Sequence, residues 1–277
     1  MTRRRGLLLS LPALALLALG FLWPFLVLLR MSLNRTDEGG SMVPDLGLAT
    51  YAKLAADDFT WSMTADSLRL AAVAASVALL LGYPMALALF RSRSRFRGVL
   101  AVAAVAPLLV SGTARVIGWL AILGDGGLVN AAITFVGLPR LALINNWTGV
   151  QIGLTESVTP YVVLALLAGF GRLDHRLEEA AATLGARPVL TFWLVTVPLT
   201  LPAILGAWLL AFLLGVSAFI TPKLMGGGRV FVLATEIYDA AVETLDWPAA
   251  AALSVYALLL LLLILAAQAA VARRVPA

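Results

Sequence analysis

Six long apolar blocks constrain the fold of this chain more than any other feature of its sequence. Each block has about 22 to 26 residues, and a helix needs roughly 20 predominantly apolar residues to cross the hydrocarbon core of a bilayer. We therefore predict an all-α membrane protein with a single transmembrane domain over residues 1–277. Its six transmembrane helices are expected at approximately residues 7–29, 67–90, 98–123, 147–170, 198–220 and 247–272.

Composition excludes two other classes of protein. Hydrophobic residues make up 61% of the chain and charged residues only 13%, which leaves too little polar surface for a soluble domain. The net charge of +5 would suit a nucleic-acid-binding protein, but the arginines lie in short segments between apolar blocks and no basic face carries interleaved aromatics. We therefore predict the lipid bilayer, and not nucleic acid, as a partner. Because cysteine is absent, no disulfide framework or thiolate metal site is expected.

The charges between the blocks predict the orientation of the chain. Residues 3–5, 91–97 and 273–274 contain nine arginines and no acid. In contrast, residues 30–58 carry five acids against three bases, and residues 221–246 carry four acids against two bases. Since cytoplasmic loops hold the excess of Lys and Arg, both termini are predicted to be cytoplasmic.

The first block also fits a cleavable signal peptide, because three arginines precede an apolar run. That run is longer than a typical signal core, and it ends at Arg30 without a clear small-x-small cleavage site. We therefore expect the first block to remain as a transmembrane helix.

The loop at residues 171–197 is amphipathic rather than merely polar. Asp174 is placed to cap a short helix whose apolar residues recur at helical spacing. Gly185 follows where a helix end needs a positive φ angle, and Pro188 suits the first turn of a second helix. The loop is therefore predicted to form a short helix pair on the cytoplasmic face that docks a partner protein.

The same loop carries a specific motif. Glu179-Ala180-Ala181 is followed after three residues by Gly185, and after nine more by Val195-Thr196-Val197-Pro198. This pattern resembles the EAA loop of ABC importer permeases, which has Glu-Ala-Ala, Gly and Ile-x-Leu-Pro at this spacing. Val195 replaces the Ile of that pattern, and Val197 replaces the Leu.

Further segments along nearly the whole chain resemble the spermidine/putrescine (PotB-like) branch of these permeases. They are Gly82-Tyr83-Pro84, residues 113–119, 173–174, 184–186 and 226–228, and Asp246-Trp247-Pro248. The resemblance implies the MetI-like fold, a place in the bacterial inner membrane, and import of a small solute by alternating access.

The resemblance also implies partners and site residues. It predicts a second homologous permease, two copies of a cytoplasmic ABC ATPase and an external substrate-binding protein. In such families the EAA helix lodges in a groove of the ATPase, which moves it as a lever. The residues that match this coupling role, or neighbour it, are Glu178, Glu179, Ala180, Ala181, Gly185 and Arg187.

We expect no enzymatic activity and no bound cofactor in this chain. It lacks the Gly-x-x-x-x-Gly-Lys-Ser/Thr phosphate loop, so ATP and Mg are expected to be used by the partner ATPase. The resemblance favours a polyamine such as putrescine or spermidine as the solute. Aminoethylphosphonate, ferric iron and thiamine remain alternatives, because related branches carry them with much the same permease pattern.

Two ionisable residues, Arg115 and Glu156, lie inside apolar blocks. Each costs several kcal/mol if it is unpaired in hydrocarbon. Their positions lie roughly 12 and 14 Å from the outer ends of their predicted helices, so antiparallel neighbours would bring them together in the outer half of the membrane. They are predicted either to form a salt bridge that fixes helix packing or to line the substrate path. Trp119 and Tyr161 lie close by in sequence and would suit cation–π contacts with an amine.

Three prolines, Pro84, Pro107 and Pro160, also lie within apolar blocks. Membrane helices tolerate proline where neighbouring groups satisfy the freed backbone atoms. Each proline is therefore either a kink that lines a path or an ordinary feature of a membrane helix.

Two rival functions are less well supported. A membrane enzyme is disfavoured because the only histidine, His175, lies in the coupling loop, which leaves no His-Glu-x-x-His helix or Ser–His pair for the membrane. A secondary transporter would need inverted repeats and an ion site of its own, and the sequence shows no repeat.

Overall fold

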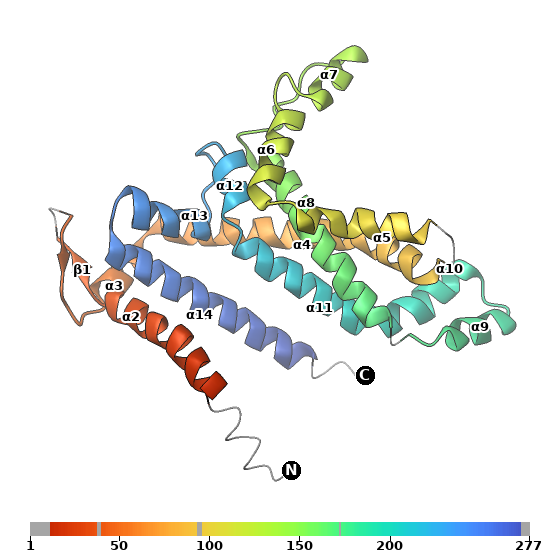
Figure 1. Cartoon of the computed structure of the whole chain (residues 1–277), viewed down its shortest axis with the longest axis horizontal. Helices are drawn as coiled ribbons and strands as arrows, with labels where there is room; N and C mark the ends of the chain where they lie inside the picture. Colours follow the sequence, from red (N-terminus) through yellow and green to blue (C-terminus); the bar gives the residue numbers. More distant parts are fainter. Residues whose placement is uncertain (1–11, 38–39, 93–95, 172, 273–277) are drawn as a thin grey trace, which may run out of the picture. The chain divides into compact units, whose positions relative to one another are not determined.

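The computed structural model describes residues 12–37, 40–92, 96–171 and 173–272, which are mostly helical (Figure 1). In these residues, six helical stretches are long and apolar enough to cross a membrane, which confirms the predicted number of transmembrane helices. They are Pro12–Met31, Asp58–Arg91, Gly112–Phe135, Trp147–Phe170, Pro188–Val216 and Trp247–Gln268. The first five residues of the first predicted helix, 7–11, lie outside the described residues, as do the arginines at positions 3–5, 93, 95 and 273–274.

The chain divides into two compact units, Met1–Ser62 with Thr235–Ala267, and Met63–Ala234 with Gln268–Ala277. The elements of the first unit begin with η1 (Ala18–Leu22) and α2 (Trp23–Met31). A small antiparallel hairpin and a short helix follow, and the unit is completed from the C-terminal part of the chain. These elements are β1 (Arg35–Thr36), β2 (Met42–Val43), α3 (Ala49–Ala56), η4 (Asp239–Glu243) and most of α14 (Trp247–Ala272).

Polar contacts hold the connection that follows α2 in the first unit. The side-chain oxygen of Asn34 accepts hydrogen bonds from Arg30 Nη1 at 2.6 Å and from the backbone N–H of Asp45 at 3.2 Å. Thr36 Oγ1 in β1 donates to Asp246 Oδ1 at 2.6 Å, which ties the hairpin to the residue before α14. Because Asn34 is buried, its amide must be hydrogen-bonded in this way.

The second unit contains most of α4 (Asp58–Arg91) and the helices up to the start of α13. In chain order these are α5 (Arg97–Val105), η2 (Ala106–Leu109), α6 (Gly112–Leu123), α7 (Leu128–Phe135), α8 (Trp147–Phe170), α9 (His175–Thr183), α10 (Pro188–Thr191), η3 (Phe192–Thr196), α11 (Val197–Val216), α12 (Ile220–Met225) and α13 (Leu233–Tyr238).

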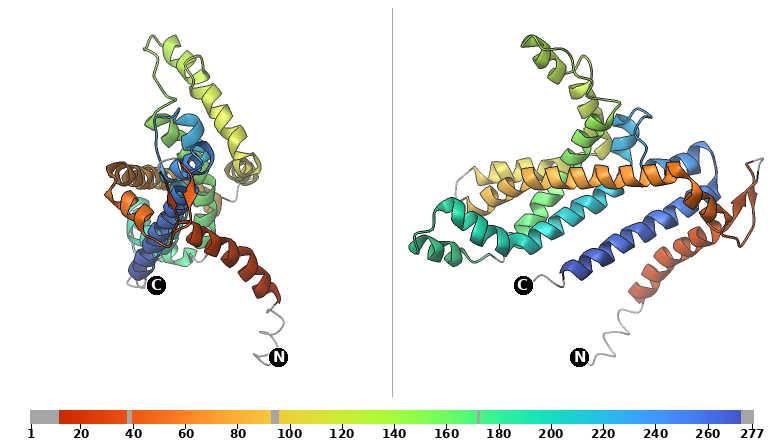
Figure 2. Two further views of the ribbon diagram at one scale, coloured as in Figure 1. Left: turned by 90° about the vertical axis from the view of Figure 1, so that its left-hand side faces the viewer. Right: turned by 180° about the vertical axis from the view of Figure 1, so that it is seen from behind.

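The centre of the second unit is α8, which packs along α11 and also contacts α5, α6 and α12. Figure 2 shows α8 in green beside α11 in cyan. A Cβ added at Gly169 would lie 2.2 Å from the Cβ of Ala203 in α11, and one added at Gly82 of α4 would lie 3.0 Å from Val162 of α8. Helices in lipid associate through such small residues because the backbones can then approach closely.

The third predicted helix, at residues 98–123, is not continuous. α5 ends at Val105, η2 carries Pro107 in its first turn, and Val110 adopts an extended conformation with ψ 136° before α6 begins. The third membrane-length stretch is accordingly Gly112–Phe135, and Arg97–Leu109 is a shorter apolar helix. The physical reason is that proline lacks an N–H and clashes with the preceding helical turn. In contrast, α4 and α8 continue through Pro84 and Pro160.

Candidate functional site

The loop at residues 171–197, in which we predicted the contact with the ATPase, contains a short helix with a well-defined start. The carboxylate of Asp174 accepts a hydrogen bond from the backbone N–H of Arg176 at 2.9 Å, so Asp174 is the N-cap of α9. This interaction satisfies one of the backbone N–H groups that a helix start leaves unpaired. The local sequence therefore positions α9, in agreement with the predicted role of Asp174.

The end of α9 is a glycine turn. Gly185 has a φ of +83°, and its N–H donates to the carbonyl of Ala182 at 2.9 Å. The N–H of Ala186 donates to the carbonyl of Ala181 at 3.0 Å, which completes a Schellman motif. A Cβ at Gly185 would meet nothing within 4 Å, so the backbone conformation, and not a lack of space, requires glycine here.

After this turn the chain enters the membrane without a break. α10, the π-helical turn η3 and α11 together form the membrane-length stretch Pro188–Val216. A turn of a few residues therefore joins α9 to a membrane-length helical stretch.

The six predicted coupling residues divide between two faces. Glu179, Ala180, Gly185 and Arg187 are exposed, whereas Glu178 and Ala181 are partly buried. Next to the exposed set, Leu184 is 88% exposed. The exposed face thus combines charge, a small residue and apolar surface.

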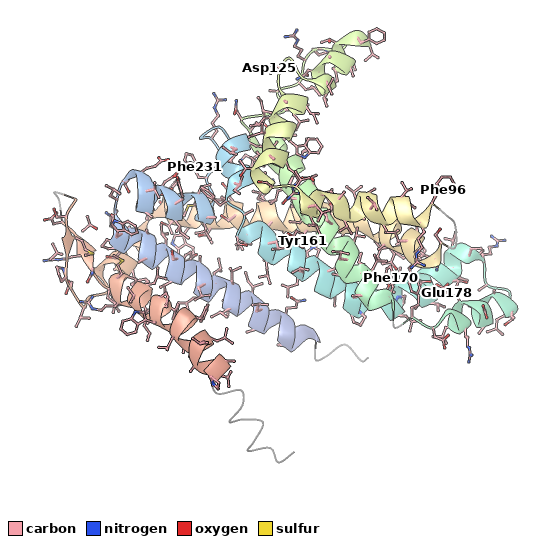
Figure 3. The ribbon with its side chains drawn as sticks, in the orientation of Figure 1. Phe96, Asp125, Tyr161, Phe170, Glu178 and Phe231 are labelled. Atoms are coloured by element: carbon pink, nitrogen blue, oxygen red, sulfur yellow. The ribbon has the colours of Figure 1, made fainter. Side chains whose placement is uncertain are left out.

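Glu178, which is labelled in Figure 3, contacts two other segments of its own chain. Its Oε1 accepts a hydrogen bond from Thr196 Oγ1 at 2.6 Å and forms an ion pair with Arg91 at 2.5 Å. Thr196 is fully buried. Arg91 and Thr196 are functional candidates that the sequence analysis missed, because no spacing within one segment shows that the end of α4 lies near η3.

Within the spans, the structure brings Arg115 of α6 and Glu156 of α8 together. Arg115 Nη1 lies 3.2 and 3.4 Å from the two carboxylate oxygens of Glu156. The side chains are only 16% and 25% exposed, so each charge offsets much of the cost of burying the other. Arg115 Nε is buried and has no hydrogen-bond partner among the described residues.

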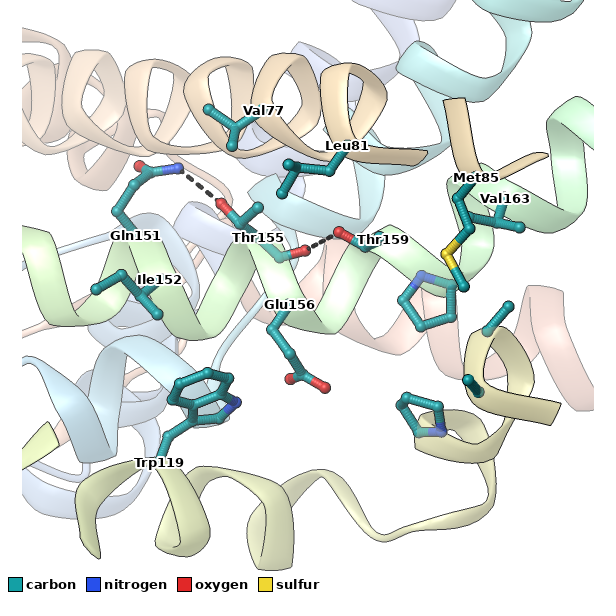
Figure 4. Close-up of a pocket in the computed structure, with 14 residues that line it drawn as sticks. Val77, Leu81, Met85, Trp119, Gln151, Ile152, Thr155, Glu156, Thr159 and Val163 are labelled. Carbon is teal, nitrogen blue, oxygen red and sulfur yellow. Dashed lines mark hydrogen bonds between the residues drawn. The ribbon is translucent and has the colours of Figure 1, made fainter. Parts of the chain in front are cut away.

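Glu156 borders two cavities in the second unit. One, of about 490 Å³, is also lined by Trp119, and Figure 4 shows both side chains reaching into it. The other, of about 390 Å³, is lined by Arg115 and Tyr161. All four predicted pathway residues therefore line one or both of these cavities.

The first cavity also has a polar stripe that the sequence analysis missed. Gln151, Thr155 and Thr159 line it from α8, four residues apart (Figure 4). Gln151 Nε2 lies 3.4 Å from Thr155 Oγ1, and Thr159 Oγ1 donates to the carbonyl of Thr155 at 2.7 Å. Their i, i+4, i+8 spacing inside an apolar block was the signal that would have found them.

Within the described part of the chain, no group of three or more His, Cys, Asp or Glu side chains is placed to hold a metal ion. The described residues contain membrane-length helices, a capped and exposed helix that leads directly into one of them, and an ion pair that borders cavities between others. These features define the class of protein, a multi-pass membrane transport subunit. The chain belongs to the family of binding-protein-dependent transport system inner membrane components, whose family model matches residues 7–276.

Known proteins agree with this assignment. The spermidine/putrescine transport system permease protein PotB of Haemophilus influenzae is 30% identical over 192 residues, 69% of this chain and 67% of the relative. The putrescine transport system permease protein PotI of Escherichia coli is 29% identical over 229 residues, 76% of this chain and 73% of the relative. In the crystal structure of a bacterial ABC transporter involved in the import of the acidic polysaccharide alginate, one chain matches with a TM-score of 0.79 at 19% identity. That match covers 99% of this chain and 98% of the other.

The chain is therefore a permease subunit of an ABC importer and a multi-pass protein of the bacterial inner membrane, with a transport rather than an enzymatic role. The resemblance to spermidine/putrescine permeases is confirmed by these relatives.

Proposed function

We propose that this permease subunit moves a polyamine such as putrescine or spermidine into the cell. The observation that carries the proposal is the similarity of most of the chain to permeases named for spermidine and putrescine transport. The cavities support it, because Trp119 supplies an aromatic face at one of them and Glu156 a carboxylate that it shares with Arg115. A carboxylate pairs with an ammonium group, and an aromatic face attracts a cation.

The proposed importer contains four kinds of subunit. They are this chain, a second homologous permease, two copies of a cytoplasmic ABC ATPase and an external substrate-binding protein. The exposed face of α9, with Glu179, Gly185 and Arg187, is the proposed contact with the ATPase. ATP and Mg act in the ATPase. Closure of the ATPase dimer moves α9, and the substrate path then opens to one side of the membrane and the other in turn.

The deciding experiment is uptake by the complete importer in proteoliposomes. Labelled putrescine and spermidine are supplied with the binding protein outside and ATP inside, alongside aminoethylphosphonate, ferric iron and thiamine. We expect ATP-dependent uptake of a polyamine and saturable polyamine binding by the isolated binding protein. Vesicles with an ATPase variant that cannot hydrolyse ATP serve as the control.

Uptake of one of the other solutes, and not of a polyamine, would assign this chain to another substrate branch of the same importer class. Polyamine uptake that this chain supports alone, driven by an ion gradient and without ATP, would contradict the proposed mechanism.

A further inference from the structure

The side chain of Glu178 joins α9 to two membrane-spanning segments. Arg91, with which it forms an ion pair, is the last residue of α4. Thr196, from which it accepts a hydrogen bond at 2.6 Å, ends the π-helical turn that leads into α11. One carboxylate thus contacts groups that lie 87 and 18 residues away along the chain.

These contacts are partly shielded from water. The side chain of Glu178 is 17% exposed and that of Arg91 is 41% exposed, while Thr196 is fully buried. A hydrogen bond to an ionised group in such a place is stronger than one between neutral groups. The contact of Glu178 with Thr196 is therefore better shielded from water than its contact with Arg91.

A second polar connection continues from Thr196 into the membrane. The carbonyl of Thr196 accepts a hydrogen bond from Thr200 Oγ1 at 2.8 Å, and that hydroxyl lies 2.9 Å from Tyr83 Oη in α4. The ring of Tyr83 packs edge-on against Phe170 at the end of α8, with centroids 5.4 Å apart. Glu178 thus stands at one end of a chain of contacts that reaches α4, α8 and α11.

The neighbouring Glu179 lies in different surroundings, because it is exposed on α9. Two adjacent glutamates therefore present their carboxylates to different environments: one to groups of its own chain and the other to solvent, where a partner can bind.

We propose that Arg91, Glu178 and Thr196 form a tether that passes the displacement of α9 to α4 and α11. The tether rests on the proposed function, in which an ATPase moves α9. Arg91 and Thr196 are positioning residues in this mechanism, and Glu178 acts within the permease rather than on the ATPase surface.

The physical reason for a tether lies in the backbone connection of α9 to the next helix. On its C-terminal side the backbone passes through the glycine turn at Gly185, and a short turn of this kind can bend without moving the helix beyond it. Side-chain contacts that join α9 directly to α4 and η3 remove this freedom.

The test uses the complete importer in proteoliposomes with putrescine as the probe, and measures putrescine taken up per ATP hydrolysed. We expect Glu178→Gln and Thr196→Val to lower this ratio by about fivefold or more, while the ATPase subunit still co-purifies with the complex. Thr134→Val is the matched control, because the hydroxyl of Thr134 bonds only to carbonyls of its own helix, α7, in the described contacts. It should keep the wild-type ratio.

The decisive variant is the charge exchange Arg91→Glu with Glu178→Arg, which restores opposite charges and leaves the Thr196 hydroxyl able to accept a hydrogen bond. We expect it to recover most of the ratio lost in Glu178→Gln. Wild-type ratios in both Glu178→Gln and Thr196→Val would overturn the tether. Loss of the ATPase subunit from the Glu178→Gln complex would also overturn it, because that loss would place Glu178 in the ATPase contact.

If the permease chains of the single variants do not fold and cannot be recovered from the membrane, the exchange variant decides, since its failure to restore both recovery and the ratio contradicts the tether. Uptake by the wild-type importer in the same vesicles tests the proposed function separately.

Discussion

At the scale of single residues, the intramembrane ion pair joins two helices and also borders two cavities. Arg115 and Glu156 neutralise each other between α6 and α8, and removing either partner leaves a charge in a poorly hydrated place. Glu156 also borders both cavities. Measuring stability and transport in the same variant separates a role in helix packing from the proposed role in the substrate path.

We expect Glu156→Gln to lower both quantities. Loss of the carboxylate leaves Arg115 unpaired, which costs at most about 3 kcal/mol because both side chains are partly exposed, so the melting temperature of the purified complex should fall. Polyamine uptake should fall by about tenfold or more, equivalent to 1.4 kcal/mol of lost interaction. Glu156→Asp, which keeps the charge, should retain more of both.

A Glu156→Gln importer that melts at a lower temperature but transports at the wild-type rate would assign the pair to helix packing alone. Thermal unfolding and uptake are therefore measured on the same preparation.

At the scale of elements, the short helix α9 depends on local chemistry at both ends. Asp174 caps its start, and Gly185 ends it with a positive φ angle. The turn sets the angle between α9 and the stretch Pro188–Val216, so its conformation belongs to the proposed coupling geometry.

We expect Gly185→Ala to destabilise this turn by about 1 kcal/mol, because alanine rarely adopts a left-handed conformation, and to reduce uptake per ATP. Gly206→Ala in α11 is the matched control. Its added Cβ also meets nothing within 4 Å, and Gly206 is not among the glycines with positive φ. The control should lose no stability, because alanine is the better helix former.

Hydrogen exchange at Leu184–Arg187 and the uptake assay check this prediction. Equal exchange and equal uptake in the two variants would show that the left-handed turn is not required.

At the scale of the whole molecule, the fold tolerates wide variation in sequence. The alginate transporter chain shares the fold at 19% identity over 99% of this chain. Lipid-facing positions require apolar side chains but no particular one, whereas the spans must satisfy their own backbone hydrogen bonds. The fold alone therefore does not define the solute.

The predicted orientation can be tested directly, because the chain has no cysteine. Ser41→Cys, in the first loop, should react with a membrane-impermeant maleimide added to intact spheroplasts. Thr183→Cys, at the end of α9, should react only after the membrane is opened. Both positions are exposed, so access to the reagent reports the side of the membrane.

The cysteine-free parent is the control for background labelling. Labelling of Thr183→Cys in sealed spheroplasts would contradict the placement of α9 on the cytoplasmic side, and with it the proposed ATPase contact.

Features that depend on neighbours along the chain were predictable from the sequence by itself. The length and hydropathy of the blocks determined six spanning helices, and Asp174 and Gly185 marked the ends of α9, because helix caps act over three or four residues. Pro107 was visible too, but only the tertiary structure shows that the helix is interrupted near it, while α4 and α8 continue through their prolines.

Only the tertiary structure decided which polar groups meet. Arg115 and Glu156 are 41 residues apart, and Arg91 and Thr196 are 105 residues apart. The similar predicted depths of Arg115 and Glu156 in the membrane suggested that they could meet, but the packing of α6 and α8 brings them together. No sequence pattern indicated the contact between Arg91 and Thr196. The two adjacent glutamates, Glu178 and Glu179, resemble each other in sequence, yet the packing of α9 against η3 gives Glu178 partners in its own chain, while Glu179 is exposed among the described residues. Local hydrogen bonding and hydropathy are encoded within a segment, whereas the pairing of distant charges depends on how the segments pack.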